Sequence, residues 1–149
     1  MKTLKAGDKA PNFEAKDHQG IVRKLRDYKG KKLVVFFYPK ASTPGCTAEA
    51  CNLRDNYHTF QSQGYEILGV SADSEKRQQN FVTKYDLPFP LLADENHNVI
   101  NGFGVWGPKK FMGREYDGIH RTTFVIDVEG TIEQVISKVK TKDHAAQIL

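Results

Sequence analysis

Cysteine is scarce in this sequence: Cys46 and Cys51 are the only two among 149 residues. A disulfide-stapled small domain carries more of them, and a structural zinc site needs about four ligands. The five histidines are scattered, none at a ligand-like spacing from the cysteines, and we interpret each as a surface or turn residue: His18, His58, His97, His120 and His144. We therefore expect no metal and no other cofactor, and we expect the cysteines to serve catalysis.

Other features are missing as well. The opening segment 1–8 has no apolar leader, and no window approaches the roughly 18 apolar residues that a membrane span needs. The net charge is only +4, and the longest basic clusters are pairs, at 31–32 and 109–110. A nucleic-acid-binding chain normally carries a denser basic stripe. These absences predict a cytoplasmic protein that binds neither nucleic acid nor a membrane.

The length and a hydrophobic content of 39% suit one globular domain spanning residues 1–149, without repeats or linkers. Hydrophobic periodicity predicts, in order, a hairpin of 13–17 with 21–25, buried strands over 33–38 and 65–71, helices over 47–61 and 74–85, a strand over 91–93, a helix over 98–103, paired strands over 121–127 and 132–136, and a helix from Asp143. Residues 106–118 show no clear period and are predicted to be an irregular excursion. This order indicates an α/β fold: a mixed central sheet, helices on both faces and an N-terminal β-hairpin.

Cys46 follows the carboxyl end of the strand predicted over 33–38, where active sites of α/β sheets collect. The loop between them is rich in proline, glycine, serine and threonine, and it opens onto a helical pattern. Unpaired N–H groups and the helix dipole at a helix N-terminus favour an anion, here the thiolate. The segment therefore predicts a redox-active or nucleophilic cysteine.

The helix after Cys46 has its apolar stripe at Ala50, Leu53, Tyr57 and Phe60. Cys46 continues this stripe and should face the protein, whereas Cys51 lies on its flank. Five residues of ideal helix separate Cα atoms by roughly 8–9 Å, but a disulfide needs about 4.4–6.8 Å. The two cysteines cannot bond while this helix is intact.

Two structural interpretations compete with catalysis. A permanent disulfide between Cys46 and Cys51 would close a small loop inside a helix that it distorts, and would gain little loop entropy. A pair of inert core thiols is the plainer alternative, but it does not account for the loop Thr43-Pro44-Gly45 before Cys46. A C-x-x-C oxidoreductase is excluded, because the spacing is C-x4-C.

The segment Pro39-Lys40-Ala41-Ser42-Thr43-Pro44-Gly45-Cys46 resembles the P-x-x-x-T/S-x-x-C signature of peroxiredoxins. Continued through Thr47-Ala48-Glu49-Ala50-Cys51, it is similar to the PrxQ, or bacterioferritin comigratory protein, branch. The likeness covers essentially the whole chain, including the segments 7–13, 68–73, 103–107 and 116–127. The second cysteine at this spacing and the late arginine make the match specific.

The resemblance implies a thioredoxin-like fold and reduction of hydroperoxides by cysteine chemistry. In that pattern Cys46 matches the peroxidatic cysteine, Cys51 the resolving cysteine, Thr43 the hydroxyl residue, Pro39 the loop proline and Arg121 the conserved arginine. It further implies a Cys46–Cys51 disulfide during turnover, with thioredoxin or a similar dithiol as the reductant. An intrachain resolving cysteine removes any chemical need for a dimer, so we expect a monomer.

The chemistry agrees with these roles. A thiolate that displaces RO⁻ from a peroxide builds negative charge on the departing oxygen, and donors aimed at that oxygen lower the barrier. The Thr43 hydroxyl, loop N–H groups and the Arg121 guanidinium are suitable donors, while Pro39 would shield the thiolate from water. Glu49 could orient Arg121, or could equally be a solvated helix residue.

Three aromatic side chains of the excursion could line the substrate mouth or meet the reductant, although packing is the commoner role: Trp106, Phe111 and Tyr116. Two other functions are alternatives to the peroxidase. A redox sensor or chaperone would pass one oxidation to a partner protein, and a thioredoxin-fold binding module with vestigial cysteines would have no reactive thiol.

Overall fold

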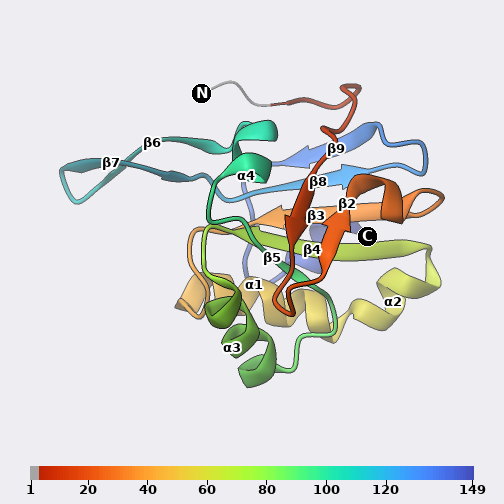
Figure 1. Ribbon diagram of the computed structural model, residues 1–149, viewed down its shortest axis with the longest axis horizontal. Coiled ribbons are helices and arrows are strands. Elements are labelled where there is room, and N and C mark those ends of the chain that lie inside the picture. Colours follow the sequence, from red (N-terminus) through yellow and green to blue (C-terminus); the bar gives the residue numbers. More distant parts are fainter. Residues whose placement is uncertain (1–3) are drawn as a thin grey trace.

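A five-stranded mixed sheet runs through the centre of this computed structural model, which describes residues 4–149 (Figure 1). In spatial order the strands are β5 (Leu91–Ala93), β4 (Tyr65–Ser71), β3 (Lys32–Phe37), β8 (Thr122–Ile126) and β9 (Ile132–Ile136). β3, β4 and β5 are parallel, whereas β8 is antiparallel to both β3 and β9. The mixed sheet predicted from the sequence is confirmed. The first three residues of the opening segment 1–8, and of the predicted 1–149 domain, lie outside the described residues.

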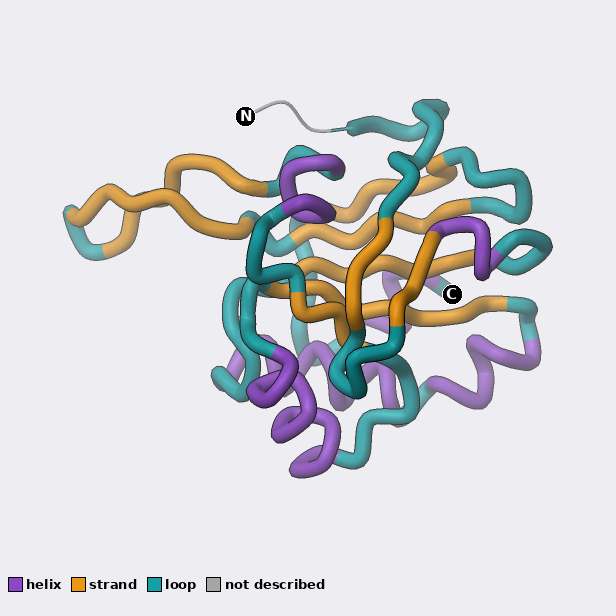
Figure 2. The backbone as a smooth tube through the Cα atoms, in the orientation of Figure 1, coloured by secondary structure: helices purple, strands orange, loops and turns teal. Residues whose placement is uncertain are grey.

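Alternating side chains of β3 supply both halves of the core. Val34 and Phe36 point to one face, and Leu33, Val35 and Phe37 point to the other. On the first face pack α1 (Pro44–Asp55), α2 (Tyr57–Ser62), α3 (Glu75–Tyr85) and α5 (His144–Ile148). The second face is covered by the hairpin of β1 (Glu14–Lys16) and β2 (Val22–Lys24), by the 3-10 helix η1 (Leu25–Tyr28) and by α4 (Asn98–Gly102). Helices therefore lie on both faces, as Figure 2 shows.

Local contacts and backbone angles define several of the predicted elements. The N-terminal hairpin pairs Glu14 with Lys24, and the Ser74 hydroxyl caps α3 by accepting from the Arg77 N–H at 3.2 Å. Gly130, in the turn between β8 and β9, has a φ of +88°, which glycine adopts without strain. Over residues 4–149, none of the helices combines the length and apolarity that would let it cross a membrane.

The helix predicted over 47–61 differs from the structure at both its start and its middle. It begins at Pro44, because a proline at the first helical position has the right φ and lacks only an N–H that would be unpaired anyway. It is interrupted at Asn56, whose side-chain amide donates to the Asn52 carbonyl at 2.8 Å. Such a side-chain bond competes with the regular helix ladder, and the chain resumes as α2.

The prediction of an irregular excursion over residues 106–118 is wrong. β6 (Trp106–Phe111) and β7 (Arg114–Ile119) form an antiparallel hairpin that projects from the body of the protein (Figure 1). Met112 and Gly113 form its turn with φ values of +51° and +78°, as two-residue hairpin turns require. Most of its side chains are exposed, including Phe111 and Tyr116. Without one buried face, the strands carry no alternating pattern in the sequence.

Candidate active site

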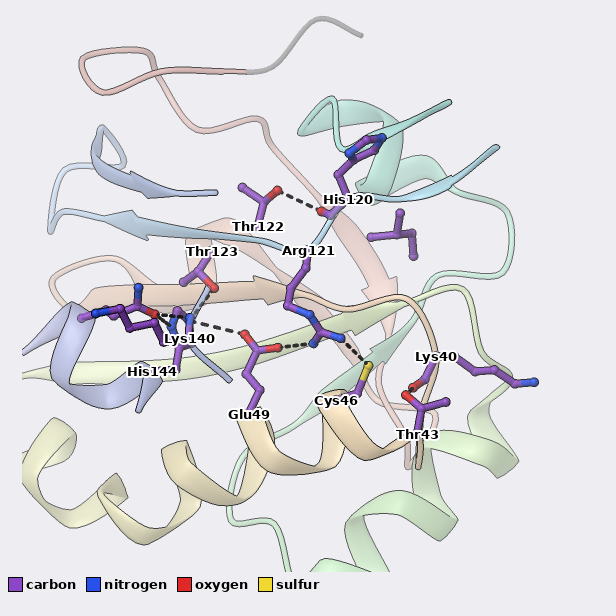
Figure 3. A network of polar contacts seen from close by, with 12 residues as sticks. Lys40, Thr43, Cys46, Glu49, His120, Arg121, Thr122, Thr123, Lys140 and His144 are labelled. Atoms are coloured by element: carbon purple, nitrogen blue, oxygen red, sulfur yellow. Dashed lines mark hydrogen bonds and ion pairs between the residues drawn. The ribbon is translucent and has the colours of Figure 1, made fainter. Parts of the chain in front are cut away.

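The register of the sheet brings Arg121 to Cys46. β8 runs antiparallel to β3 with Thr122 opposite Phe37, so the residue before β8 lies beside the loop that follows β3. Arg121 is that residue. Its Nη2 donates to the Cys46 Sγ at 3.3 Å, across 75 residues of sequence (Figure 3). Two of the predicted site residues are thus in contact.

Cys46 lies in the first turn of α1, as expected, and is 1% exposed. Thr43 is the N-cap residue, but its side chain makes no capping hydrogen bond. The first N–H groups of a helix have no intrahelical acceptor, so those of Gly45 and Cys46 can serve a bound ligand. This helix end and the Arg121 guanidinium both favour a thiolate at Cys46.

Glu49 lies one turn after Cys46 and is fully buried rather than solvated. Its Oε1 accepts from the Arg121 Nη1 at 2.7 Å, so the guanidinium bridges the sulfur and the carboxylate. Burial raises the pKa of Glu49 to about 7, although the ion pair with Arg121 acts in the opposite direction. Burial alone would lower the pKa of Arg121, but Cys46 and Glu49 raise it, and the guanidinium keeps its charge.

Thr43 and Pro39 lie in the same loop, in arrangements that the sequence does not specify. The Thr43 hydroxyl donates to the Lys40 carbonyl at 2.8 Å, so its hydrogen is already engaged and an oxygen lone pair is left for a ligand. Pro39 is half-buried and directly follows the buried Tyr38. The donor role that the sequence predicts for the Thr43 hydroxyl therefore does not fit this arrangement, because its hydrogen is donated to Lys40, while the shielding role of Pro39 remains a prediction.

Cys51 is half-buried on the same helix, and both cysteines are free thiols. α1 is continuous from Pro44 to Asp55, so an intact helix separates the two sulfur atoms. The conflict between helix and disulfide that the spacing predicts therefore applies to this structure. Joining the two sulfur atoms would require α1 to open.

Sequence reasoning missed the residues that hold the loop from β3 to α1. The Asp73 Oδ2 accepts from the Ala41 N–H and from the Ser71 hydroxyl, both at 2.7 Å. The Gln78 side chain extends this network, donating to the Ser71 Oγ at 2.8 Å and accepting from the Tyr38 hydroxyl at 2.6 Å. The only signal in the sequence was Gln78, a polar residue at a position of the predicted helix that faces the core. Hydrophobic periodicity does not single out such a residue.

The interpretation of His144 as a surface or turn residue is wrong. Its side chain is fully buried, because α5 packs directly on α1 and on the sheet. The Nε2 atom lies 2.7 Å from the Thr123 hydroxyl and 3.4 Å from the Glu49 Oε2 (Figure 3). A single histidine at the start of a short predicted helix gives no sign of this in the sequence.

Comparisons with known proteins find relatives over almost the whole chain. The model of the AhpC/TSA family matches residues 6–135. Peroxiredoxin Bcp of Escherichia coli (strain K12) is 48% identical over 149 residues, which cover 100% of this chain and 96% of that protein. Peroxiredoxin Bcp of Bacillus subtilis (strain 168) is 48% identical, covering 99% and 94%.

A solved structure of a related protein is also similar to this chain. The bacterioferritin comigratory protein of Xanthomonas campestris, studied for its alkyl peroxide reduction activity, has a TM-score of 0.86 and 37% identity, covering 91% of this chain and 87% of that one.

Proposed function

The chain belongs to the AhpC/TSA family, in the PrxQ or bacterioferritin comigratory protein branch of the peroxiredoxins, and on this premise we propose that it reduces hydroperoxides with Cys46 as the nucleophile. The contact that carries the proposal joins the Arg121 Nη2 to the Cys46 Sγ at 3.3 Å. A buried thiol paired with a guanidinium at a helix N-terminus is in the environment of a reactive thiolate. Alkyl peroxide reduction by the Xanthomonas campestris protein supports organic hydroperoxides as substrates beside hydrogen peroxide.

The first step forms a sulfenic acid. The Cys46 thiolate attacks one oxygen of the peroxide, the O–O bond breaks, and the sulfur takes up an OH group while RO⁻ departs and gains a proton. The Arg121 guanidinium and the first-turn N–H groups of α1 stabilise the charge on the departing oxygen. Because its own hydrogen is donated to Lys40, the Thr43 hydroxyl would accept from the peroxide O–H. Pro39 limits the access of water.

The second step forms a Cys46–Cys51 disulfide and releases water. α1 must open for this, which breaks the Glu49–Arg121 pair and the hydrogen bonds that join Asn52 to Ala145 of α5 and to Lys142 just before α5. Local opening of an element costs only a fraction of the global free energy of unfolding. Thioredoxin or a similar dithiol would then reduce the disulfide.

Hydrogen exchange on the reduced and oxidised protein tests this opening. Protection of residues 47–53 should fall on oxidation, while protection of β3 and β4 stays the same. Equal protection of 47–53 in both forms, with a confirmed intrachain disulfide, would contradict the proposed opening.

Steady-state consumption of hydrogen peroxide and of an alkyl hydroperoxide, with a thioredoxin system, tests the function itself. Many turnovers per chain support the enzyme, whereas a single stoichiometric oxidation favours the redox sensor. Cys46→Ser should abolish turnover, and Cys51→Ser should stop after one sulfenic acid per chain. Turnover retained by Cys46→Ser would refute the assignment.

We further propose that the protein is a monomer that works in the cytoplasm. Both statements rest on the sequence. Size-exclusion chromatography with light scattering, on the reduced and the oxidised protein, tests the first, and fractionation of the source cells tests the second.

A further inference from the structure

Glu49 has an unsatisfied oxygen in the interior of the protein. Its Oε1 pairs with Arg121, but its Oε2 is buried without a hydrogen-bond partner, 3.4 Å from the His144 Nε2. Both side chains are fully buried. An unpaired buried carboxylate oxygen costs free energy, so its position against an imidazole nitrogen needs an explanation.

The hydrogen bonds around His144 determine where its first proton lies. The Gln147 amide is oriented by two backbone groups, since its Nε2 donates to the Lys138 carbonyl and its Oε1 accepts from the Lys140 N–H. That same Oε1 lies 2.7 Å from the His144 Nδ1. Because Oε1 only accepts, Nδ1 must carry a hydrogen.

The second nitrogen then faces the carboxylate. In a neutral imidazole with its hydrogen on Nδ1, the lone pair of Nε2 accepts from the Thr123 hydroxyl at 2.7 Å. The same lone pair would also face the Glu49 Oε2, and two acceptors 3.4 Å apart repel each other. One more proton, on His144 or on Glu49, turns this repulsion into attraction.

We infer that His144 is a positioning residue of the Cys46 site: with Glu49 it forms a buried acid–base pair that shares one proton and holds the Arg121 guanidinium against the Cys46 sulfur. The inference rests on the proposed function for the thiolate at Cys46. Burial lowers the pKa of His144 and raises the pKa of Glu49 to about 7, which brings the shared proton into the neutral range.

The charges of the cluster explain why one proton suits it. The three groups in direct contact, a thiolate at Cys46, a guanidinium at Arg121 and a carboxylate at Glu49, sum to one negative charge, which the shared proton cancels. Among residues 4–149, Lys109 on β6 also faces the cluster, outside these contacts. Its amine donates to the Ile119 carbonyl, and its pKa is lowered first by burial and then by Arg121, while Cys46 raises it.

Oxidation of Cys46 should therefore be coupled to the pair. The reaction RS⁻ + ROOH + H⁺ → RSOH + ROH removes the negative charge of the sulfur. With a neutral sulfenic acid beside Arg121, the protonated pair would leave the cluster with one excess positive charge. The affinity of the pair for its proton must then fall, and the pair releases the proton.

The C-terminal helix keeps the imidazole in place. The Asn52 side chain of α1 accepts from the Ala145 N–H of α5 at 2.7 Å, and it donates at 3.2 Å to the carbonyl of Lys142, just before α5. His144 is thus fixed to the same helix that carries Cys46 and Glu49.

Nitrogen NMR of the imidazoles in the Cys51→Ser protein tests the coupling without altering the pair. Spectra are recorded from pH 5.5 to 8.5, with Cys46 free and with Cys46 alkylated by iodoacetamide. We expect the His144 resonances to titrate about one pH unit lower after alkylation, and those of the exposed His58 to stay unchanged. An identical titration of His144 in both forms would overturn the inference.

A variant tests the effect on reactivity. His144→Gln cannot hold the proton, and its single-turnover oxidation by hydrogen peroxide should be about tenfold slower at pH 7. In the unmodified protein, the plot of this rate against pH should show an inflection near pH 7. Both His144→Gln and Glu49→Gln should lose that inflection. His58→Gln, which removes an exposed histidine, should match the unmodified protein.

A folded His144→Gln protein with the rate and the inflection of the unmodified protein would contradict the positioning role. If this variant does not fold, the NMR titration of the unmodified pair decides. If the unmodified protein does not reduce peroxides at all, the proposed function fails, yet the same titration still reports whether His144 senses the charge of Cys46.

Discussion

The turn of the N-terminal hairpin and the second turn of α1 each bury a carboxylate completely, but they treat it differently. In the hairpin turn, the Asp17 Oδ1 accepts from two backbone N–H groups at 2.8 and 3.0 Å, and its Oδ2 accepts from the Arg23 Nε at 2.9 Å. In α1, Glu49 has an arginine on one oxygen and no hydrogen bond on the other.

The contrast separates a structural carboxylate from one with a chemical role. Burying a charge is tolerated where hydrogen bonds replace the lost water, as they do at Asp17. Glu49 lacks that compensation, and a proton-carrying group lies against its free oxygen. Buried titratable groups that are poorly compensated gather at functional sites, and Glu49 lies one helical turn after Cys46, the cysteine that we propose reacts.

Removal of the arginine should have the largest effect. Arg121→Met takes away the group that contacts both Cys46 and Glu49, so we expect the rate of peroxide reduction to fall by about 10²–10³-fold. Arg23→Met, which removes the corresponding partner of Asp17, should leave the rate unchanged. Stopped-flow kinetics on both variants measures the difference, and equal rates would remove the functional distinction between the two regions.

The pH dependence of stability should come next in size. The pKa of Glu49 is raised from 4.5 to about 7, so between these values the folded protein holds a proton that the unfolded chain has lost. Its contribution is fully present below pH 4.5, and the free energy of unfolding falls as the pH rises towards 7, by on the order of 1 to 3 kcal/mol.

Glu49→Gln should remove this fall in the free energy of unfolding between pH 4.5 and 7. His144 acts in the opposite sense, because burial lowers its pKa and its contribution is lost as the pH falls below 6.5. Urea denaturation of the unmodified protein and of Glu49→Gln, from pH 4.5 to 8, isolates the glutamate. Parallel curves would show that the carboxylate is compensated as well as Asp17 is.

Asp17→Asn should give the converse result, a loss of stability without a loss of activity. One amide cannot accept from both backbone N–H groups and also pair with Arg23, so we expect about 2 kcal/mol of destabilisation. Denaturant unfolding and the peroxide assay are measured on the same sample. A fall in rate for the protein that remains folded would extend the functional region to the hairpin.

The smallest effect should come from one methyl group. A Cβ at Gly45 would lie 3.2 Å from the Arg121 Nη2, so Gly45→Ala should displace the guanidinium by a few tenths of an ångström from its position beside the sulfur. We expect about a tenfold slower reaction without a loss of thermal stability, since alanine favours the helix. In Gly102→Ala the Cβ would meet Pro11 at an ordinary 3.7 Å, and this control should leave the rate unchanged.

Most of the fold could be predicted because its strands and helices have one buried face or two. β4 is found over the same residues, 65–71, as its apolar run predicts. The hairpin of β6 and β7 was missed because it projects from the core and has no buried stripe. The break at Asn56 was missed because it depends on one side-chain bond to the Asn52 carbonyl, which competes locally with the helix.

The sequence by itself determined the reactive segment. A buried strand, a loop with proline and glycine, and Cys46 at the start of a helix follow from local preferences, which act over a few residues and can be read from them. The flank position of Cys51 and the strain of any bond between the two cysteines follow from helix geometry alone. Arg121 and Glu49 could be named in advance as candidates, but their contacts could not be predicted.

Only the tertiary structure decided those contacts. The Arg121 guanidinium reaches Cys46 because β8 pairs antiparallel with β3 in one register, and a shift of one residue would turn the side chains of β8 to the other face. His144 reaches Glu49 because α5 docks on α1 through Asn52, and nothing near His144 in the chain indicates that it is buried. Contacts between distant segments depend on how whole faces pack, and each face is shaped by residues from many parts of the chain.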